Sequence, residues 1–201
     1  MFAGRLPQSP ASAAPSNGRS YAYISNFVSN SVSVFDTTDP SAAVPGSPIS
    51  VGSGPIGLAV SPRGGELYVA INSTDSVAII DTATNTVSGS IGVGDHPVGV
   101  TFTPNGRKAY VSNQGDDTLS VIDVATGTVT ETVALGQTPG EMMGITPDGS
   151  RAFVANQSAN TTSVIRTSDD TVLQTVATGQ QPTEVAIGTV QRDDDSCGCG
   201  R

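Results

Sequence analysis

Aromatic side chains are scarce in this chain. Tryptophan is absent, and phenylalanine, tyrosine and tryptophan together make up 4% of the 201 residues. A core therefore has to be built from Val, Ile, Leu and Ala, which suits closely stacked β-sheets. The same scarcity argues against a large aromatic platform on which sugars or bases would stack.

Basic residues are half as frequent as acidic ones. Nine Lys and Arg stand against eighteen Asp and Glu, which gives a net charge of -9. Such a chain repels phosphate backbones, so we expect neither nucleic acid nor an anionic membrane surface as a partner. No apolar run approaches the roughly 20 residues of a membrane span. Residues 1–20 also lack the apolar centre of a signal peptide.

Cysteine and histidine, the common metal ligands, are nearly missing as well. The two cysteines are Cys197 and Cys199, and the chain has one histidine. A thiol pair that binds a metal usually needs further ligands nearby, and the sequence supplies none. We interpret residues 191–201 as an acidic tail and residues 1–19, rich in Pro, Ser and Ala, as a flexible arm. The folded domain is predicted over residues 20–190.

An internal repeat of just over 40 residues occupies that domain. Strand-like segments YISN, YVAI, YVSN and FVAN begin at Tyr23, Tyr68, Tyr110 and Phe153, spaced 45, 42 and 43 residues apart. Prolines that open the next unit follow at Pro55, Pro97, Pro139 and Pro182. Each unit contains four runs rich in β-formers, separated by turn signals, and none has a helical period. The pattern predicts an all-β chain, and its period is typical of the four-stranded antiparallel blades of a β-propeller.

The ends of the repeat are unequal. With the strands of a unit labelled a to d, we expect strand a at 56–61, 98–103 and 141–146, and strand b at 21–26, 66–71, 108–113 and 151–156. Strand c is expected at 31–36, 76–81, 118–123 and 162–167, and strand d at 47–51, 86–91, 128–134 and 171–177. The first unit lacks strand a, and a lone a-like segment, 182–188, follows the last unit. We predict that this segment completes the first sheet and closes a four-bladed ring, which removes both open edges. The alternative is that two copies each supply half of an eight-bladed ring.

The turn after strand c has an aspartate in three units, at Asp36, Asp81 and Asp123. Such a side chain can accept hydrogen bonds from backbone N–H groups two or three residues further on. Arg166 takes the place of this aspartate in the fourth unit, so that turn must be held differently.

Candidate site residues lie in the d-to-a and b-to-c connections, which emerge on one face of a propeller. His96 occupies the slot of Gly54, Thr138 and Gln181 in the other units, and beside Asp95 it could act as a base or a metal ligand. The alternative is an ordinary surface histidine. The predicted ligand-binding face consists of Asp75, Asp95, His96, Asn113, Asp116, Asp117, Thr138 and Gln181.

Glu141 and Glu184 replace the glycines found at the same place in the other units, Gly57 and Gly99. Two carboxylates near a narrow channel could share a proton or hold Ca²⁺. They could equally be solvated carboxylates on the rim. No other cofactor is predicted.

The segment AYVSNQGDDTLSVIDVATGTVTETVALG, residues 109–136, resembles the YVTN-repeat β-propeller family, and the resemblance extends over about residues 20–188. Family members include surface-layer and cell-surface proteins, which implies an extracellular or cell-surface location. Relatives in the wider propeller group include lactonases, lyases and quinone-cofactor dehydrogenase subunits.

Two functions compete on these grounds. The first is a non-enzymatic scaffold whose polar loops bind a protein, a glycan or another copy of the chain. The second is a small hydrolase-like, lyase-like or cofactor-binding propeller that acts on a lactone or similar substrate through His96, Asp95, Glu141 and Glu184. No catalytic motif of a known type occurs in the chain, so we favour the binding scaffold.

Overall fold

The computed structural model describes residues 19–135 and 138–188, with the side chains of Glu141 and Met142 excepted. The predicted arm, apart from Arg19, and the predicted tail with Cys197 and Cys199 lie outside the described residues. Among the residues that are described, no helix is long and apolar enough to cross a bilayer.

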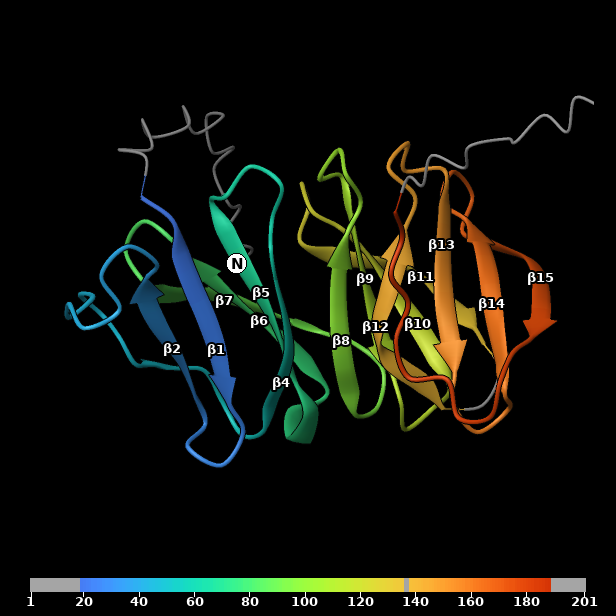
Figure 1. The fold of residues 1–201 in the computed structure, drawn as a ribbon, viewed down its shortest axis with the longest axis horizontal. Helices are drawn as coiled ribbons and strands as arrows, with labels where there is room; N and C mark the ends of the chain where they lie inside the picture. The colour runs from blue at the N-terminus through green and yellow to red at the C-terminus, as the bar shows by residue number, and fades with distance from the viewer. Residues whose placement is uncertain (1–18, 136–137, 189–201) are drawn as a thin grey trace, which may run out of the picture.

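Four antiparallel sheets follow one another along the chain (Figure 1). Sheet A contains β1 (Tyr21–Asn26), β2 (Ser31–Asp36) and β3 (Ile49–Ser50), and sheet B contains β4 (Pro55–Val60), β5 (Glu66–Ile71), β6 (Ser76–Asp81) and β7 (Thr86–Gly92). Sheet C contains β8 (Pro97–Phe102), β9 (Lys108–Asn113), β10 (Thr118–Asp123) and β11 (Thr128–Ala134), and sheet D contains β12 (Pro139–Ile145), β13 (Arg151–Asn156), β14 (Thr161–Arg166) and β15 (Thr171–Ala177). A short 3-10 turn, η1 (Asn72–Thr74), joins β5 to β6. These fifteen strands agree with the predicted ones to within two residues at their ends.

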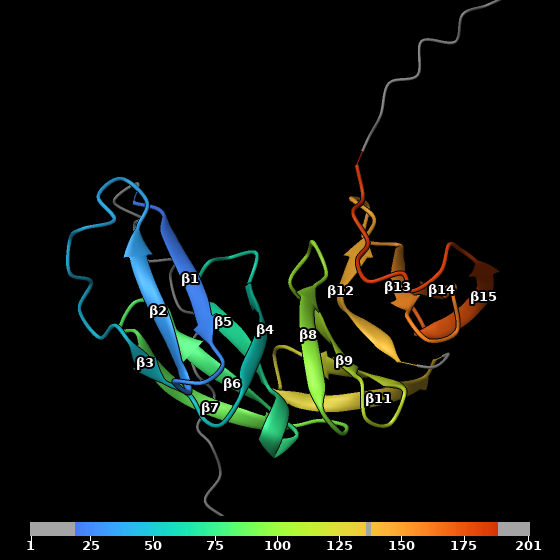
Figure 2. The same ribbon diagram turned by 60° about the horizontal axis from the view of Figure 1, so that its bottom comes forward.

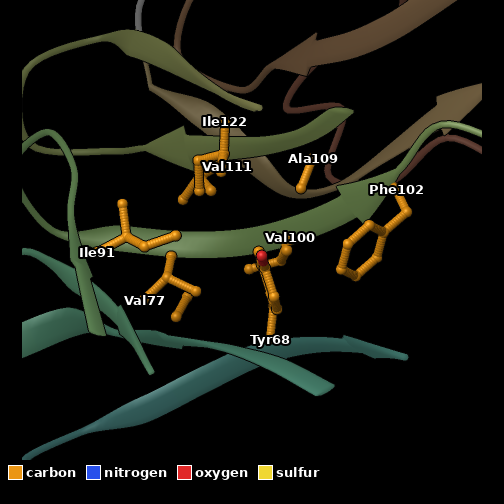
Figure 3. Packing of buried hydrophobic residues seen from close by; sticks show 9 residues of the cluster. Tyr68, Val77, Ile91, Val100, Phe102, Ala109, Val111 and Ile122 are labelled. Atoms are coloured by element: carbon orange, nitrogen blue, oxygen red, sulfur yellow. The ribbon is translucent and has the colours of Figure 1, made fainter. Parts of the chain in front are cut away.

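The core consists of apolar layers between neighbouring sheets. The layer between sheets B and C contains Tyr68, Val77, Val100, Phe102 and Ile122 (Figure 3). The rings of Tyr68 and Phe102 meet edge to face, with 4.8 Å between their centroids. Strands β5 and β9 each have five consecutive buried residues, because sheets cover both of their faces. This explains the continuous apolar runs in the strands labelled b.

The first strands of neighbouring sheets, β1, β4, β8 and β12, lie side by side (Figure 1). Their backbones approach so closely that a Cβ atom placed on Gly57 would lie 2.4 Å from the carbonyl oxygen of Val98 and 2.7 Å from the Cα of Gly99. Only glycine fits there. The inner strands β4 and β8 are therefore in direct backbone contact at this point.

The predicted closure of a four-bladed ring is not what the structure shows. Among the described residues sheet A has three strands, and residues 182–188 form no strand. This segment instead lies beside β12, where Thr183 contacts Gly140, and Val185 and Ile187 contact Gly144. Figure 2 shows the four sheets as an open arc with sheets A and D at its ends. The apolar layer between two neighbouring sheets fixes the angle between them. The three layers between the four sheets do not add up to a turn that would bring sheets A and D together.

The arc has two edges that bear the loops. We call the edge with the b-to-c loops and the d-to-a connections the connection face, and the edge with the a-to-b and c-to-d turns the turn face. In Figure 1 the connection face is at the bottom, where η1 lies, and the turn face is at the top.

Candidate functional site

A repeated hydrogen bond holds the connection face together. In every sheet the residue before strand c and the residue at the end of the next connection have left-handed backbones. The side-chain oxygen of the first accepts a hydrogen bond from the backbone N–H of the second. The pairs are Asn30 with Gly54 (3.0 Å), Asp75 with His96 (2.9 Å), Asp117 with Thr138 (2.6 Å) and Asn160 with Gln181 (2.8 Å). We call this arrangement the connection clamp.

The clamp places one residue of each connection at an equivalent position. Left-handed backbone is costly for residues other than glycine, and it is uncommon before proline, so the accepting side chain supports a strained conformation. Four different residues, Gly54, His96, Thr138 and Gln181, occupy this held position. The clamp has a signal in the sequence: an Asn or Asp lies 21 residues before each of His96, Thr138 and Gln181. Sequence reasoning missed it.

Asp75→Ala is expected to lower the free energy of unfolding by about 1 kcal/mol, because the His96 N–H loses its acceptor. Asp75→Asn should keep most of the stability, since Asn30 and Asn160 fill the same role with an amide oxygen. Equilibrium unfolding in urea measures both variants. An equal loss in the two would mean that the charge of Asp75, and not its hydrogen bond, stabilises the connection.

His96 and Asp95 are exposed on this face. Their backbones are anchored: the Asp95 N–H donates to Asp116 Oδ2 at 3.2 Å, and the carbonyl of His96 accepts from Gln114 at 3.0 Å. The His96 ring lies against Gly115, where an added Cβ would be 2.6 Å from Nδ1. No ion pair joins this ring to a carboxylate within the described part of the chain. The ring is thus held at a loop surface, without the carboxylate partner that usually orients a catalytic imidazole.

Asn113 does not lie on the exposed surface where it was predicted. Its side chain is fully buried, and Nδ2 donates to the hydroxyls of Thr118 and Ser120, both at 2.9 Å. Asn156 makes the equivalent bonds in sheet D. The Oδ1 atoms of both asparagines are buried without a partner among the described residues. Asn113 therefore ties β9 to β10 beneath the connection.

The other predicted face residues differ in exposure. Asp75, Asp116 and Gln181 are exposed, whereas Asp117 and Thr138 are half-buried. Asp116 also accepts a bond from the Thr118 hydroxyl at 2.6 Å. Several of these polar groups are thus engaged in holding the loops themselves.

The two predicted glutamates lie on neighbouring segments. Glu184 is exposed within the segment 182–188, which runs beside the strand that carries Glu141. The side chain of Glu141 lies outside the described residues. In the described ranges, no group of three or more His, Cys, Asp or Glu side chains could hold a metal ion. A Ca²⁺ ion at the glutamates stays a prediction.

The turn aspartates have the structural role predicted for them. Asp36 accepts bonds from the hydroxyl and the N–H of Thr38, which lower the pKa of its carboxyl group. Asp123 does the same with the N–H and hydroxyl of Thr126, and its pKa is also lowered. In the fourth turn Arg166 bonds to Asp169 at 2.8 Å, and Asp169 in turn accepts from the Thr171 hydroxyl at 2.9 Å. Arg166 is therefore accommodated by a carboxylate three residues further on.

Successive antiparallel sheets with their first strands side by side and apolar layers between their faces are the blades of a β-propeller. Residues 82–187, more than half of the chain, match the family described as "Lactonase, 7-bladed beta-propeller", and the chain belongs to this family. The described residues contain four sheets. Membership of the more specific YVTN-repeat family stays a prediction.

Solved structures support the fold. The chain is 28% identical to Kuenenia stuttgartiensis hydrazine synthase, with a TM-score of 0.62 over 65% of this chain and 38% of that one. A functionally unknown protein from Desulfotomaculum acetoxidans is 18% identical, with a TM-score of 0.66 over 83% of this chain and 56% of that one. U3-55K is 10% identical, with a TM-score of 0.58 over 63% and 40%. The chain thus spans between 38% and 56% of the length of these proteins. Among curated proteins, none matches this chain.

Proposed function

We propose that this chain is a binding scaffold that presents its connection face to a partner. The connection clamp is the observation that carries the proposal. It holds one position of each connection in a constant backbone conformation, while the side chain there changes from Gly54 to His96, Thr138 and Gln181. A constant frame with variable side chains is a typical arrangement of a recognition surface on a rigid scaffold.

The chemistry of this face suits a polar partner. Asp75, Asp95 and Asp116 are exposed there, together with the His96 imidazole and the Gln181 amide. Carboxylates and amides bind hydroxyl and basic groups through hydrogen bonds, so the partner classes are a glycan, a protein with a basic surface, or another copy. A location outside the cell, at the cell surface, accords with such partners and belongs to the same proposal.

Titration of the ¹⁵N-labelled chain with soluble glycans and basic peptides tests this function. We expect a binding member of the panel to shift the backbone amide signals of His96 and Gln181. The amides of Gly64 and Gly106, on the turn face, serve as internal controls and should not move. Shifts confined to the turn face would contradict the proposal.

Lactone hydrolysis is the second candidate, and the family match over residues 82–187 favours it. His96, with Asp95 beside it, would take a proton from the water that attacks the lactone carbonyl. The bond from that carbon to the ring oxygen would then break and the proton would pass to the released oxygen, with Glu141 and Glu184 as further proton acceptors. Hydrolysis of a simple δ-lactone, followed in a pH-stat, tests it. If the triple variant His96→Ala, Glu141→Gln and Glu184→Gln loses a turnover that the unaltered chain has, a hydrolase replaces the binding scaffold.

We also propose that blades from a second copy extend the open arc, as in the alternative of an eight-bladed ring made by two copies. The support is that neither sheet A nor segment 182–188 is complete as a blade among the described residues. Light scattering coupled to size-exclusion chromatography should then give the mass of two chains. The mass of a single chain at all concentrations would exclude this assembly.

A further inference from the structure

The turn face carries charges of both signs, and in sheets C and D Asp123, Asp148, Asp169 and Asp170 lie in the same turns as the basic residues. Arg63, Arg107, Lys108, Arg151 and Arg166 lie on this face, which is five of the nine basic residues of a chain with a net charge of -9. Lys108 is neutralised, because its Nζ lies 2.7 Å from Asp170 and 2.8 Å from the carbonyl oxygen of Thr167. The guanidinium groups of Arg107 and Arg151 make no hydrogen bond or ion pair with any described residue.

Two of these arginines face each other across the sheet. Arg151 at the start of β13 and Arg166 at the end of β14 are direct cross-strand partners. The corresponding pair in sheet C is Lys108 with Asp123, which has opposite charges. Like charges directly opposite in an antiparallel sheet are destabilising. Asp169 offsets part of this repulsion at Arg166, but both groups of that ion pair are nearly half exposed and it is therefore weak.

The arginine pair borders a depression in the surface. This depression has a volume of about 510 Å³ and is lined by Ser150, Arg151, Arg166, Thr167, Ser168 and Leu173. A second depression of about 290 Å³ continues from it at Thr167 and Ser168 and reaches Arg107. Among the described residues around the two depressions, Arg107, Arg151 and the Ser168 hydroxyl have no side-chain partner, whereas Arg166 pairs with Asp169 and the Thr167 hydroxyl donates to the Gly149 carbonyl. Arg166 stands where the three other units have an aspartate, so the charge reversal falls within this depression.

We propose that Arg151 and Arg166 bind an oxyanion, the carboxylate or phosphate group of a small polar ligand. A guanidinium presents two parallel N–H donors that match such a group, and two guanidiniums on paired strands can hold it between them. Ser168 supplies a hydroxyl donor at the rim of the same depression, whereas the Ser150 hydroxyl already donates to the Asp148 carboxylate at 2.9 Å. The bound anion removes the repulsion between the arginines, so binding and stability are coupled. The site lies on the face opposite the connection clamp and is independent of the function proposed above.

Titration of the full chain with inorganic phosphate and, separately, with gluconate tests the site. Binding is followed by the side-chain Nε–Hε signals of the arginines and by thermal unfolding, with sodium chloride at equal ionic strength as the reference. We expect saturable shifts at Arg151 and Arg166 and a raised melting temperature with at least one of the two anions. The anion that saturates at the lower concentration identifies the group, phosphate or carboxylate.

Arg166→Asp separates binding from a general effect of salt. This substitution restores the residue type of the other three units and places a carboxylate opposite Arg151, where it competes with the anion for that guanidinium. The variant should bind at least tenfold more weakly, as should Arg151→Gln. Arg63→Gln, on the turn face but outside both depressions, is the matched control and should bind like the unaltered chain. Equal effects of phosphate or gluconate and of chloride, or unchanged binding by Arg166→Asp and Arg151→Gln, would overturn the proposal.

Discussion

Gly57→Ala lowers the free energy of unfolding by about 3 kcal/mol, the upper range for overpacking a closely packed site. The added methyl group would lie 2.4 Å from the carbonyl oxygen of Val98 and 2.7 Å from the Cα of Gly99. Both neighbours are backbone atoms of β8, so the clash cannot be relieved by rotating a side chain. The two strands must move apart, and the apolar layer between sheets B and C opens with them. Urea unfolding, monitored by circular dichroism, measures the loss.

Gly65→Ala is the matched control for this experiment. Gly65 is exposed in the turn between β4 and β5, and an added Cβ has no atom within 4 Å. We expect its stability to stay within about 0.5 kcal/mol of the unaltered chain, as for other surface substitutions. If Gly57→Ala were equally harmless, the inner strands would not be in backbone contact, and the arrangement of sheets B and C would have to be revised.

Asp170→Ala is expected to lower the free energy of unfolding by about 3 kcal/mol, because it leaves two partners without their acceptor. Asp170 lies in the last c-to-d turn, yet it accepts bonds from Lys108 Nζ at 2.7 Å and from the Tyr110 hydroxyl at 2.6 Å, both in β9 of the neighbouring sheet. Its side chain is only 10% exposed. Burial and the bond to Asp170 raise the pKa of Tyr110, so this hydroxyl remains a donor at neutral pH. The network joins sheets C and D at the turn face.

Two further variants show how much of the stability lost in Asp170→Ala comes from its hydrogen bonds. Tyr110→Phe removes one hydrogen bond and keeps the ring, so it should cost about 1 kcal/mol. Asp169→Ala removes the adjacent, exposed carboxylate and should cost clearly less than Asp170→Ala, because solvent screens its ion pair with Arg166. Thermal unfolding at pH 7 ranks all three. A loss from Asp169→Ala as large as that from Asp170→Ala would show that the bonds to Lys108 and Tyr110 do not join the sheets.

The site was less accessible to sequence reasoning than the fold. The equivalence of His96 with Gly54, Thr138 and Gln181 was predicted from spacing, and the structure places all four at one clamped position. His96 makes no ion pair with a carboxylate among the described residues, and its role beside Asp95 as a base or metal ligand stays a prediction. Spacing along the chain locates a loop, but the direction in which an imidazole points depends on its packing, here against Gly115.

The sequence by itself determined the strands, their antiparallel order and the turns between them. These features are local: they depend on alternating and continuous apolar runs, on Pro-Asn-Gly-like turns and on aspartates that cap the turn they begin. Because the pattern repeats every 40 or so residues, a strand or turn predicted in one unit could be compared with the same position in the other units.

Only the tertiary structure decided how the blades are placed and which polar groups meet. Closure depends on the angle that each apolar layer sets between two sheets, which no repeat length encodes, and the arc proved open. The Lys108–Asp170 contact joins residues 62 apart in sequence, and the Arg151–Arg166 pair depends on strand register. The first contact arises because stacking brings the turns of neighbouring blades together, and the second because the antiparallel register places the ends of β13 and β14 side by side.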